Sequence, residues 1–306
     1  MSRVQPHHYL LLLAVAAGSQ TVLGKFALER MPVFGYATLR FILAYVFIYA
    51  AMRMTGRSIP WKKIIPFAPV GLITIAAGTA FIFGLQRTNA TTAQFIHTAI
   101  PILTALFAGM ILRRRLSNIQ WIGVMIAFFG VVVTITSNGG LSLQNTSFIG
   151  NLLVFLSALG FAFYAVLTKL PRYKDVDPFE MIFISFTFGV PLILPFAVAE
   201  YIHIGNWVPA VSAEAWIAVL LASVSMVFFA TVFQMLINKV GPSYASLNQY
   251  LNPIVVIFWA ALLLQELPVL QAVIGALIAL MGVGLVTWRQ RKDDLEASVR
   301  ASNSAE

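Results

Sequence analysis

The sequence predicts an all-α membrane protein of ten transmembrane helices, on the basis of its apolar composition, the length of its apolar segments and the placement of its basic residues. Of the 306 residues, 59% are apolar and only 10% are Asp, Glu, Lys or Arg. A water-soluble surface of this size would not carry that composition. Lipid is therefore the expected solvent for most of the chain, and we expect a multi-pass protein of the inner (plasma) membrane.

Apolar segments fill the chain and are separated by short polar breaks. A helix needs about 20 mainly apolar residues to cross a bilayer core. The segments are Tyr9–Leu28, Val33–Met52, Ile64–Leu85, Ala90–Leu112, Asn118–Ser137, Phe148–Thr168, Phe179–Ile202, Ala213–Ile237, Ser243–Leu264 and Pro268–Trp288. Membrane β-strands alternate apolar and polar residues, whereas Ile122–Val133 is apolar on every face. Helices are therefore predicted throughout, followed by an unstructured tail over 289–306.

The net charge of +9 is placed unevenly along the chain. If both termini are cytoplasmic, Arg30 and Arg87 lie outside and Lys25 and Arg40 lie within spans, so the other 16 of the 20 Lys and Arg residues lie inside. The positive-inside rule thus predicts an N-in, C-in topology, which requires an even number of helices. The excess of basic residues is therefore explained by the orientation of the protein in the membrane, and no nucleic-acid partner is expected.

The chain offers little for catalysis or metal binding. It has no cysteine, which excludes thiolate ligands and cysteine nucleophiles. None of its eleven acidic residues falls in a predicted span core, whereas calcium and related ions need clustered oxygens. We therefore predict no enzyme activity, no metal and no cofactor.

An internal repeat relates the two halves of the sequence. An offset of 152 residues aligns Pro101 with Pro253, Gly123 with Gly275 and Gly130 with Gly282. The predicted units are residues 9–137, residues 148–288 and a cytoplasmic tail of residues 289–306. Because five helices per copy is an odd number, the two copies must have opposite orientations. This is the inverted-repeat architecture of secondary transporters, in which two packings of one unit exchange roles during alternating access.

Short motifs recur at matching places in the two halves. In the first half they are Gly18–Lys25, Leu39-Arg40-Phe41, Leu85–Thr88 and Leu112–Gly123, and in the second Gly241–Leu247, Asn252-Pro253, Leu264–Glu266 and Gly275–Gly282. Over residues 9–288 the chain resembles the EamA-type domain of the drug/metabolite transporter superfamily. The resemblance implies ten helices, alternating access, and export or exchange of amino acids, related metabolites or drugs. The sequence departs from the pattern at Arg114, where the second copy has Glu266, and at Asn252, where the family often has an acid.

The paired prolines mark the candidate binding site. A helix proline frees the carbonyl four residues earlier, which belongs to His97 for Pro101 and to Gln249 for Pro253. Interrupted helices at matching positions point to a site within the membrane, so Pro101 and Pro253 are predicted hinges. The predicted substrate-binding residues are Arg40, Gln94, His97, Thr98, Tyr164, Asn248, Gln249 and Asn252, of which Tyr164 is implied by the family resemblance. The alternative is that the prolines only kink their helices and that the polar side chains form hydrogen bonds between helices instead of binding a ligand.

Two ionisable side chains stand out within the predicted spans. A histidine exchanges a proton near neutral pH, so His97 is the candidate for proton coupling, although a lone histidine also serves as a simple hydrogen-bond donor. Arg40 lies inside the second helix with no acid in any span core. It either caps carbonyl groups or receives a substrate carboxylate.

These observations predict a secondary transporter that exports a small amphiphilic metabolite, such as an amino acid or a related compound. Multidrug efflux and metabolite import are alternatives for the same fold. A passive channel and a membrane scaffold are further alternatives, and the sequence does not predict an oligomeric state.

Overall fold

The computed structural model is a bundle of helices, described for residues 6–111, 117–137, 142, 144–173 and 176–303, with backbone alone for residues 6, 7 and 287–303. The first half contains α1 (Pro6–Leu28), α2 (Val33–Met54), η1 (Trp61–Lys63), α3 (Ala68–Arg87), α4 (Ala90–His97), α5 (Ile100–Ile111) and α6 (Asn118–Ile135). The second half contains α7 (Thr146–Leu167), α8 (Pro178–Thr187), α9 (Gly189–Ile204), η2 (Val208–Ala210), α10 (Ala213–Val240), α11 (Pro242–Ala245), η3 (Ser246–Tyr250), α12 (Asn252–Leu263) and α13 (Leu270–Asn303). The described residues form no strand, so the predicted all-α class is confirmed.

Within these ranges, nine helical segments are long and apolar enough to cross a membrane. The segment over Leu270–Val286 is apolar but shorter. Together they fall on the ten predicted segments, and many large apolar side chains, including Phe129, Ile202 and Leu262, are exposed on them. Such a surface needs lipid around it. The count of ten spanning helices stays a prediction.

Three of the apolar segments are interrupted. One break lies between α4 and α5 and precedes Pro101, in the first turn of α5. Another is the 3₁₀ segment η3, which precedes Pro253 in the first turn of α12. A third break, at Phe188 between α8 and α9, precedes Pro191 and was not predicted. In each case the proline removes a donor and clashes with the carbonyl four residues earlier, so the helix ends before it.

Two boundaries differ from the predictions by four residues or more. Helix α3 begins at Ala68 rather than Ile64, because the segment before it contains Pro66 and forms a 3₁₀ turn over Trp61–Lys63. The predicted unstructured tail is wrong for residues 289–303, which continue α13 as a helix. Its Arg, Lys, Leu, Glu and Ala residues are good helix formers and extend a helix already nucleated in the bundle.

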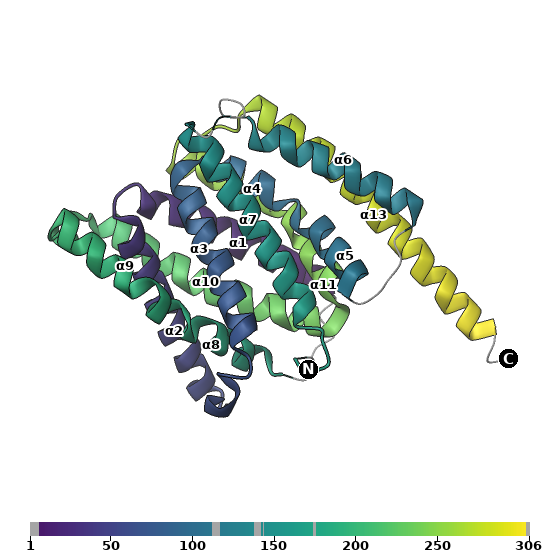
Figure 1. Cartoon of the computed structure of the whole chain (residues 1–306), viewed down its shortest axis with the longest axis horizontal. Helices are drawn as coiled ribbons and strands as arrows, with labels where there is room; N and C mark the ends of the chain where they lie inside the picture. Colours follow the sequence, from purple (N-terminus) through teal and green to yellow (C-terminus); the bar gives the residue numbers. More distant parts are fainter. Residues whose placement is uncertain (1–5, 112–116, 138–141, 143, 174–175, 304–306) are drawn as a thin grey trace.

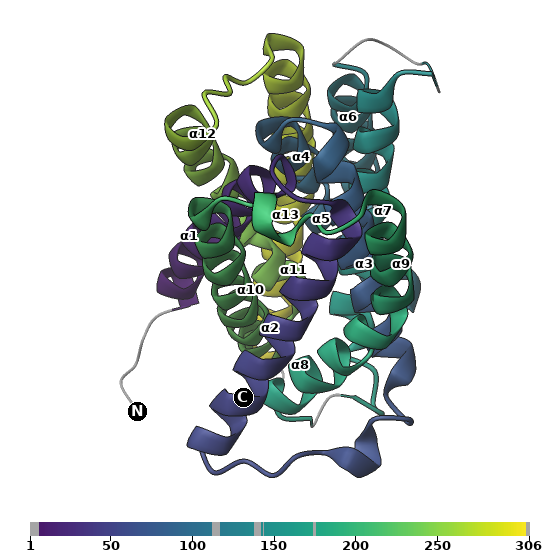
Figure 2. The ribbon, with the colours of Figure 1, turned by 90° about the vertical axis from the view of Figure 1, so that its left-hand side faces the viewer.

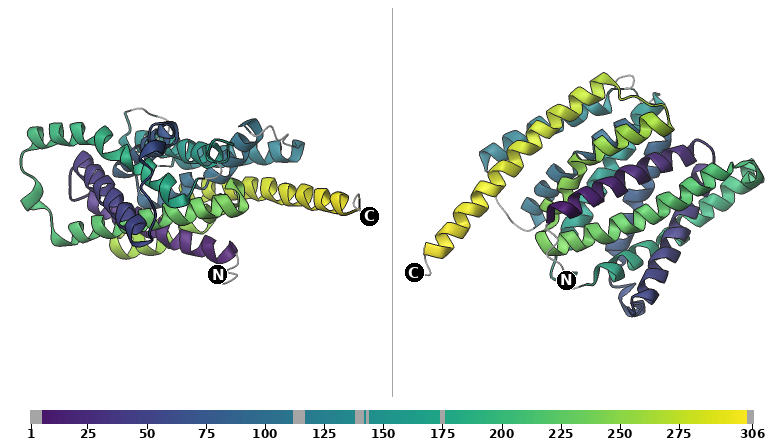
Figure 3. Two further views of the ribbon diagram at one scale, coloured as in Figure 1. Left: turned by 90° about the horizontal axis from the view of Figure 1, so that it is seen from below. Right: turned by 180° about the vertical axis from the view of Figure 1, so that it is seen from behind.

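The two halves interlock. Helix α1 packs on α10 and α12, and its equivalent α7 packs on α3 and α5, which are the equivalents of α10 and α12. From behind, α1 lies between α12 and α10 (Figure 3, right). The first helix of each half thus lies against the third and fourth segments of the other half, so neither half buries its apolar core alone.

A glycine seam joins the last helices of the two halves. Helices α6 and α13 run side by side along one edge of the bundle (Figure 1). A Cβ added at Gly123 would meet the carbonyl of Gly282, and one added at Gly130 would meet the carbonyl of Gly275. The offset of 152 residues relates Gly123 to Gly275 and Gly130 to Gly282, so each of these two contacts is the repeat equivalent of the other. Contacts in the interface of a two-fold symmetric dimer are related in the same way. Because later residues of α6 meet earlier residues of α13, the equivalent helices are antiparallel.

The start of α1, the end of α13 and the α2–α3 connection all lie toward the lower side of the bundle in Figure 1. Figure 2 shows the same grouping in its lower half. Ion pairs of Arg57 with Asp177, at 3.3 Å, and of Lys63 with Glu180 tie the two halves together there. Both ends of the described chain therefore lie on one side, as an even number of spans requires, and the assignment of that side to the cytoplasm stays a prediction.

Candidate functional site: a central cavity lined by both halves

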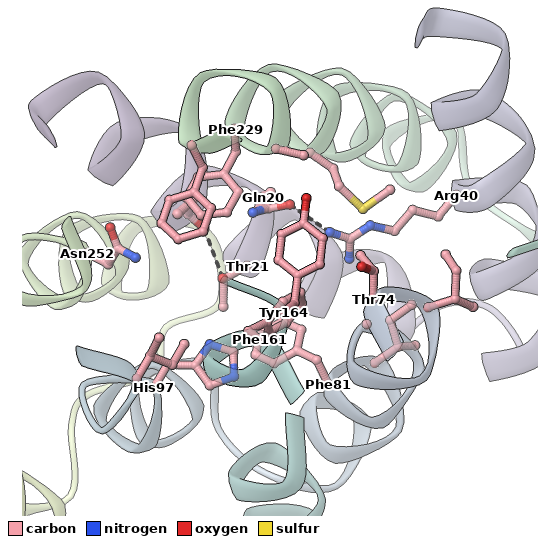
Figure 4. Close-up of a pocket in the computed structure, with 18 of the residues that line it drawn as sticks. Gln20, Thr21, Arg40, Thr74, Phe81, His97, Phe161, Tyr164, Phe229 and Asn252 are labelled. Atoms are coloured by element: carbon pink, nitrogen blue, oxygen red, sulfur yellow. Dashed lines mark hydrogen bonds between the residues drawn. The ribbon is translucent and has the colours of Figure 1, made fainter. Parts of the chain in front are cut away.

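A cavity of about 110 Å³ lies in the centre of the bundle (Figure 4). Helices α1, α2, α3, α4 and α5 line it from the first half, and α7, α8, α10, η3 and α12 line it from the second. Its polar or ionisable lining residues are Gln20, Thr21, Arg40, Thr74, Gln94, His97, Tyr164, Gln249 and Asn252. The space is large enough for several water molecules or a small ligand, and its wall is mostly apolar, with these polar groups set into it.

Arg40 forms the positive pole of the cavity. Its side chain is buried, at 4% exposure, and its two terminal nitrogens donate to Tyr36 Oη at 3.1 Å and to Gln20 Oε1 at 2.8 Å. Its Nε has no hydrogen-bond partner, and Arg40 forms no ion pair with any Asp or Glu in the described ranges. The guanidinium is therefore held in place by neutral groups and keeps an uncompensated charge.

An amide pole lies on the other side. Gln249 Oε1 accepts hydrogen bonds from Gln94 Nε2 at 3.2 Å and from Asn252 Nδ2 at 2.8 Å. This network connects α4 of the first half with η3 and α12 of the second. His97 Nε2 and Asn252 Oδ1 are buried without a partner. Because buried polar groups are normally paired, these two atoms are available to a bound molecule.

Aromatic rings separate the two poles. The His97 ring lies 4.6 Å from the ring of Phe81 and 6.1 Å from that of Phe161, measured between centroids. Tyr164 projects between Arg40 and His97 in Figure 4 and donates its hydroxyl to Gln234 Oε1 at 2.8 Å. The cavity thus offers an apolar middle with a polar group at each end, which suits an amphiphilic ligand.

Six of the eight predicted substrate-binding residues line this cavity: Arg40, Gln94, His97, Tyr164, Gln249 and Asn252. Thr98 and Asn248 do not. Thr98 donates to Phe95 O of its own helix at 2.6 Å, and Asn248 is buried away from the lining. The hinge candidates Pro101 and Pro253 also lie outside the lining, each beside a residue that belongs to it, Ile100 and Asn252.

Sequence reasoning missed Gln20, Thr21 and Thr74. Gln20 is the residue that holds Arg40, and its signal was a polar side chain within an apolar span. Thr21 and Thr74 bond to carbonyls one turn back in their own helices. Threonine does this throughout membrane helices, so nothing in the sequence distinguishes these two from the other threonines.

Two glutamates of the second half cap helices of the first half. Glu266, after α12, accepts the N–H of Ala90 at the start of α4 at 2.9 Å. Glu200 of α9 accepts the N–H of Gly35 near the start of α2 at 2.8 Å. Neither helix has a side-chain cap from its own N-cap residue. A carboxylate at a helix N-terminus is favoured by the free N–H groups and the dipole, so these contacts hold the halves together at the end opposite the termini.

The Glu266 contact predicts a pH-dependent stability. Burial raises the pKa of the Glu266 carboxyl above its ordinary value of 4.5, against the opposing effects of the Ala90 hydrogen bond and the Lys25 charge. The folded state therefore binds this proton more tightly than the unfolded state. The stability that this carboxyl contributes is fully present at pH values below its ordinary pKa. It decreases as the pH rises through its raised pKa in the folded protein. Melting of the purified protein across this window should show the decrease, and Glu266→Gln should remove it.

The matched control is Glu200→Gln, which removes the carboxylate from the other cap and leaves Glu266 in place. It should keep the pH dependence of the wild type over the same window. An equal pH dependence in the wild type and in Glu266→Gln would contradict the assignment to Glu266.

A helical bundle with a lipid-suited surface and an internal polar and aromatic cavity between two repeats is the architecture of a membrane carrier. The sequence profile of the EamA-like transporter family matches residues 7–136 and again residues 148–288. The chain therefore belongs to the EamA-like transporter family and is a multi-pass membrane transporter.

Its relatives carry transporter names. The "Uncharacterized transporter YetK" of Bacillus subtilis is 24% identical over 297 residues, with 94% of this chain and 88% of the relative covered. The "Uncharacterized inner membrane transporter YedA" of Escherichia coli K12 is 23% identical over 257 residues, with 81% and 79% covered. The "S-adenosylmethionine uptake transporter" of Rickettsia prowazekii is 25% identical over 288 residues, with 93% and 92% covered.

A solved structure titled "Crystal structure of protein" has a similar fold. It superimposes with a TM-score of 0.62 at 18% sequence identity, and the match covers 94% of this chain and 98% of the other. The helical arrangement described above thus occurs over nearly the whole length of both chains.

Proposed function

We propose that this protein is a secondary transporter that exports a small amphiphilic metabolite, an amino acid or a related compound, across the inner membrane by alternating access. The observation that carries the proposal is the central cavity, which both halves line and which has polar poles and an apolar middle. The proposal includes ten spanning helices in two inverted repeats, residues 9–137 and 148–288, with both termini and the tail of residues 289–306 in the cytoplasm.

Two features support alternating access. In the glycine seam, the antiparallel helices α6 and α13 meet through two contacts that are repeat equivalents of each other. Such symmetry is expected for inverted copies that swap conformations. The helix interruptions before Pro101 and Pro253 lie beside the cavity, which supports these prolines as hinges. The unpartnered Nε2 of His97 supports this residue as the proton-coupling group.

Counterflow in proteoliposomes tests the proposal. Vesicles preloaded with each of the common amino acids receive the same compound, radiolabelled, outside. For a substrate, an alternating-access carrier should give faster uptake and a transient accumulation of label compared with empty vesicles. Uptake that preloading does not accelerate indicates a channel, and no uptake in any vesicle contradicts an amino acid as the substrate. An imposed pH gradient that changes the wild-type and His97→Asn rates equally contradicts coupling through His97.

Uptake is the second candidate direction. The specific observation in its favour is the name of the Rickettsia relative, an S-adenosylmethionine uptake transporter. Cells that overproduce the protein distinguish the two directions. Export gives resistance to a toxic analogue of the substrate, whereas uptake gives greater sensitivity.

A further inference from the structure

The charge of the cavity indicates the chemical class of the substrate. Arg40 is the only Lys or Arg among the residues that line the cavity, and none of those residues is an Asp or Glu. We propose that the substrate is a small organic anion with one carboxylate and an apolar, aromatic-compatible body, and that Arg40 binds the carboxylate. This inference rests on the proposed transport function and specifies its substrate.

The hydrogen bonds of Arg40 leave a place for an anion. A guanidinium carries five N–H donors in a planar fork, and here only two hydrogen bonds hold it, to Tyr36 and Gln20. Both partners are neutral, and Nε is buried without one. A buried charge is normally paired with an opposite charge, and a carboxylate matches the guanidinium fork with two parallel hydrogen bonds. A substrate carboxylate would supply the missing counter-ion.

The same lining disfavours ammonium groups. A zwitterion in this cavity would have its carboxylate neutralised by Arg40, but its ammonium would find no carboxylate in the lining, only neutral amide oxygens, hydroxyls and ring faces. A simple amine would also be repelled by Arg40 in a site with little water to screen the charges. The expected order of affinity is therefore anion, then zwitterion, then cation.

The rest of the cavity fits the body of such an anion. Phe81, Phe161 and Phe229 provide apolar walls (Figure 4). On the far side from Arg40, His97 Nε2 and Asn252 Oδ1 are unpartnered. A ligand that reaches from Arg40 past Tyr164 thus finds an apolar middle, and a keto, hydroxyl or amide group at its far end finds a hydrogen-bond partner.

Four ligands that share a phenyl ring and a two-carbon chain test the order. They are 3-phenylpropionate (anion), phenylalanine (zwitterion), 3-phenylpropanamide (neutral) and 2-phenylethylamine (cation). Binding to the purified wild-type protein is measured by the shift of its melting temperature with ligand concentration. We expect 3-phenylpropionate to bind about tenfold or more tightly than the amide, since only the acid forms a charge-assisted pair with the guanidinium. Equal or tighter binding of the amine, or no binding of 3-phenylpropionate, overturns the inference.

Variants locate the selectivity. Arg40→Gln should lose the preference for the acid over the amide, and Arg40→Lys should retain part of it, because lysine keeps the charge without the fork. Arg30→Gln is the matched control, since it removes an exposed arginine that contacts Phe26 outside the cavity. Unchanged selectivity in Arg40→Gln contradicts the role of Arg40. If Arg40→Gln does not fold, the wild-type ligand series still decides on the anion class.

Counterflow of the same ligands separates this inference from the transport function. Accelerated exchange of the amine or the amide without the acid retains the transporter and rejects the anionic substrate. If neither these ligands nor any amino acid exchanges, the proposed function itself is rejected. Accelerated exchange of 3-phenylpropionate by the wild type, lost in Arg40→Gln and retained in Arg30→Gln, supports both.

Discussion

Replacing Gly130 with leucine is expected to prevent stable folding or to lower the melting temperature severely. An added Cβ at Gly130 would meet the backbone of Ala279 and the carbonyl of Gly275 on α13. Backbone atoms cannot move aside as a flexible side chain can, so α6 and α13 must separate. Overpacking a close-packed interior costs about 1–3 kcal/mol, occasionally more, and this seam is closer than most. Size-exclusion profiles after heating detergent-solubilised protein measure the effect.

Gly284→Leu is the matched control on the same seam helix. A Cβ added at Gly284 meets no atom within 4 Å, so a leucine there should leave the melting temperature close to that of the wild type. Equal destabilisation by the two variants would show that α6 and α13 do not pack through the glycine seam.

Gly78→Phe is expected to abolish transport and to leave the protein folded. Gly78 lines the cavity, and the nearest atom to an added Cβ is Cζ of Phe41 at 3.8 Å, an ordinary contact. A phenyl group can therefore enter the empty space and occupy the volume that a ligand needs. We expect counterflow to fall by at least tenfold, while expression and melting temperature stay near those of the wild type.

Leu72→Phe controls for a bulky aromatic residue on the same helix. Leu72 of α3 is 43% exposed on the apolar surface, where a larger apolar side chain meets lipid. This variant should transport normally. Full transport by Gly78→Phe would mean that the substrate does not pass through the central cavity.

The positions of the apolar helices could be predicted because spanning a membrane depends on local apolar length. Breaks near Pro101 and Pro253 could also be predicted, since proline acts on its own helix. The break at Phe188 follows the same rule through Pro191, but no repeat marked it. Helix partners could not be predicted, because they depend on residues far apart in sequence. Gly284, for example, lies on α13 two residues after the seam glycine Gly282, yet a Cβ added there meets no atom within 4 Å.

The candidate site was predictable where a polar residue had to avoid lipid. Gln94, Gln249 and Asn252 come together for this reason. Asn248 is displaced because the segment Ser246–Tyr250 winds as a 3₁₀ helix, in which residues three apart share a face. Gln249 of this segment lines the cavity, as does Asn252 at the start of α12, whereas Asn248 does not. The winding of this segment depends on tertiary contacts and was not readable from the sequence.

The uncompensated Arg40 has an electrical consequence. The empty cavity carries one positive charge, whereas a cavity that holds a monocarboxylate is neutral. Moving a unit charge across 100 mV corresponds to about 2.3 kcal/mol, or roughly a 50-fold change in an equilibrium. An inside-negative potential therefore acts on the step in which the empty cavity turns back to face the cytoplasm. In a cycle that moves no coupled proton, each turn carries one negative charge outward, so the resting voltage of the cell itself would drive the anion out.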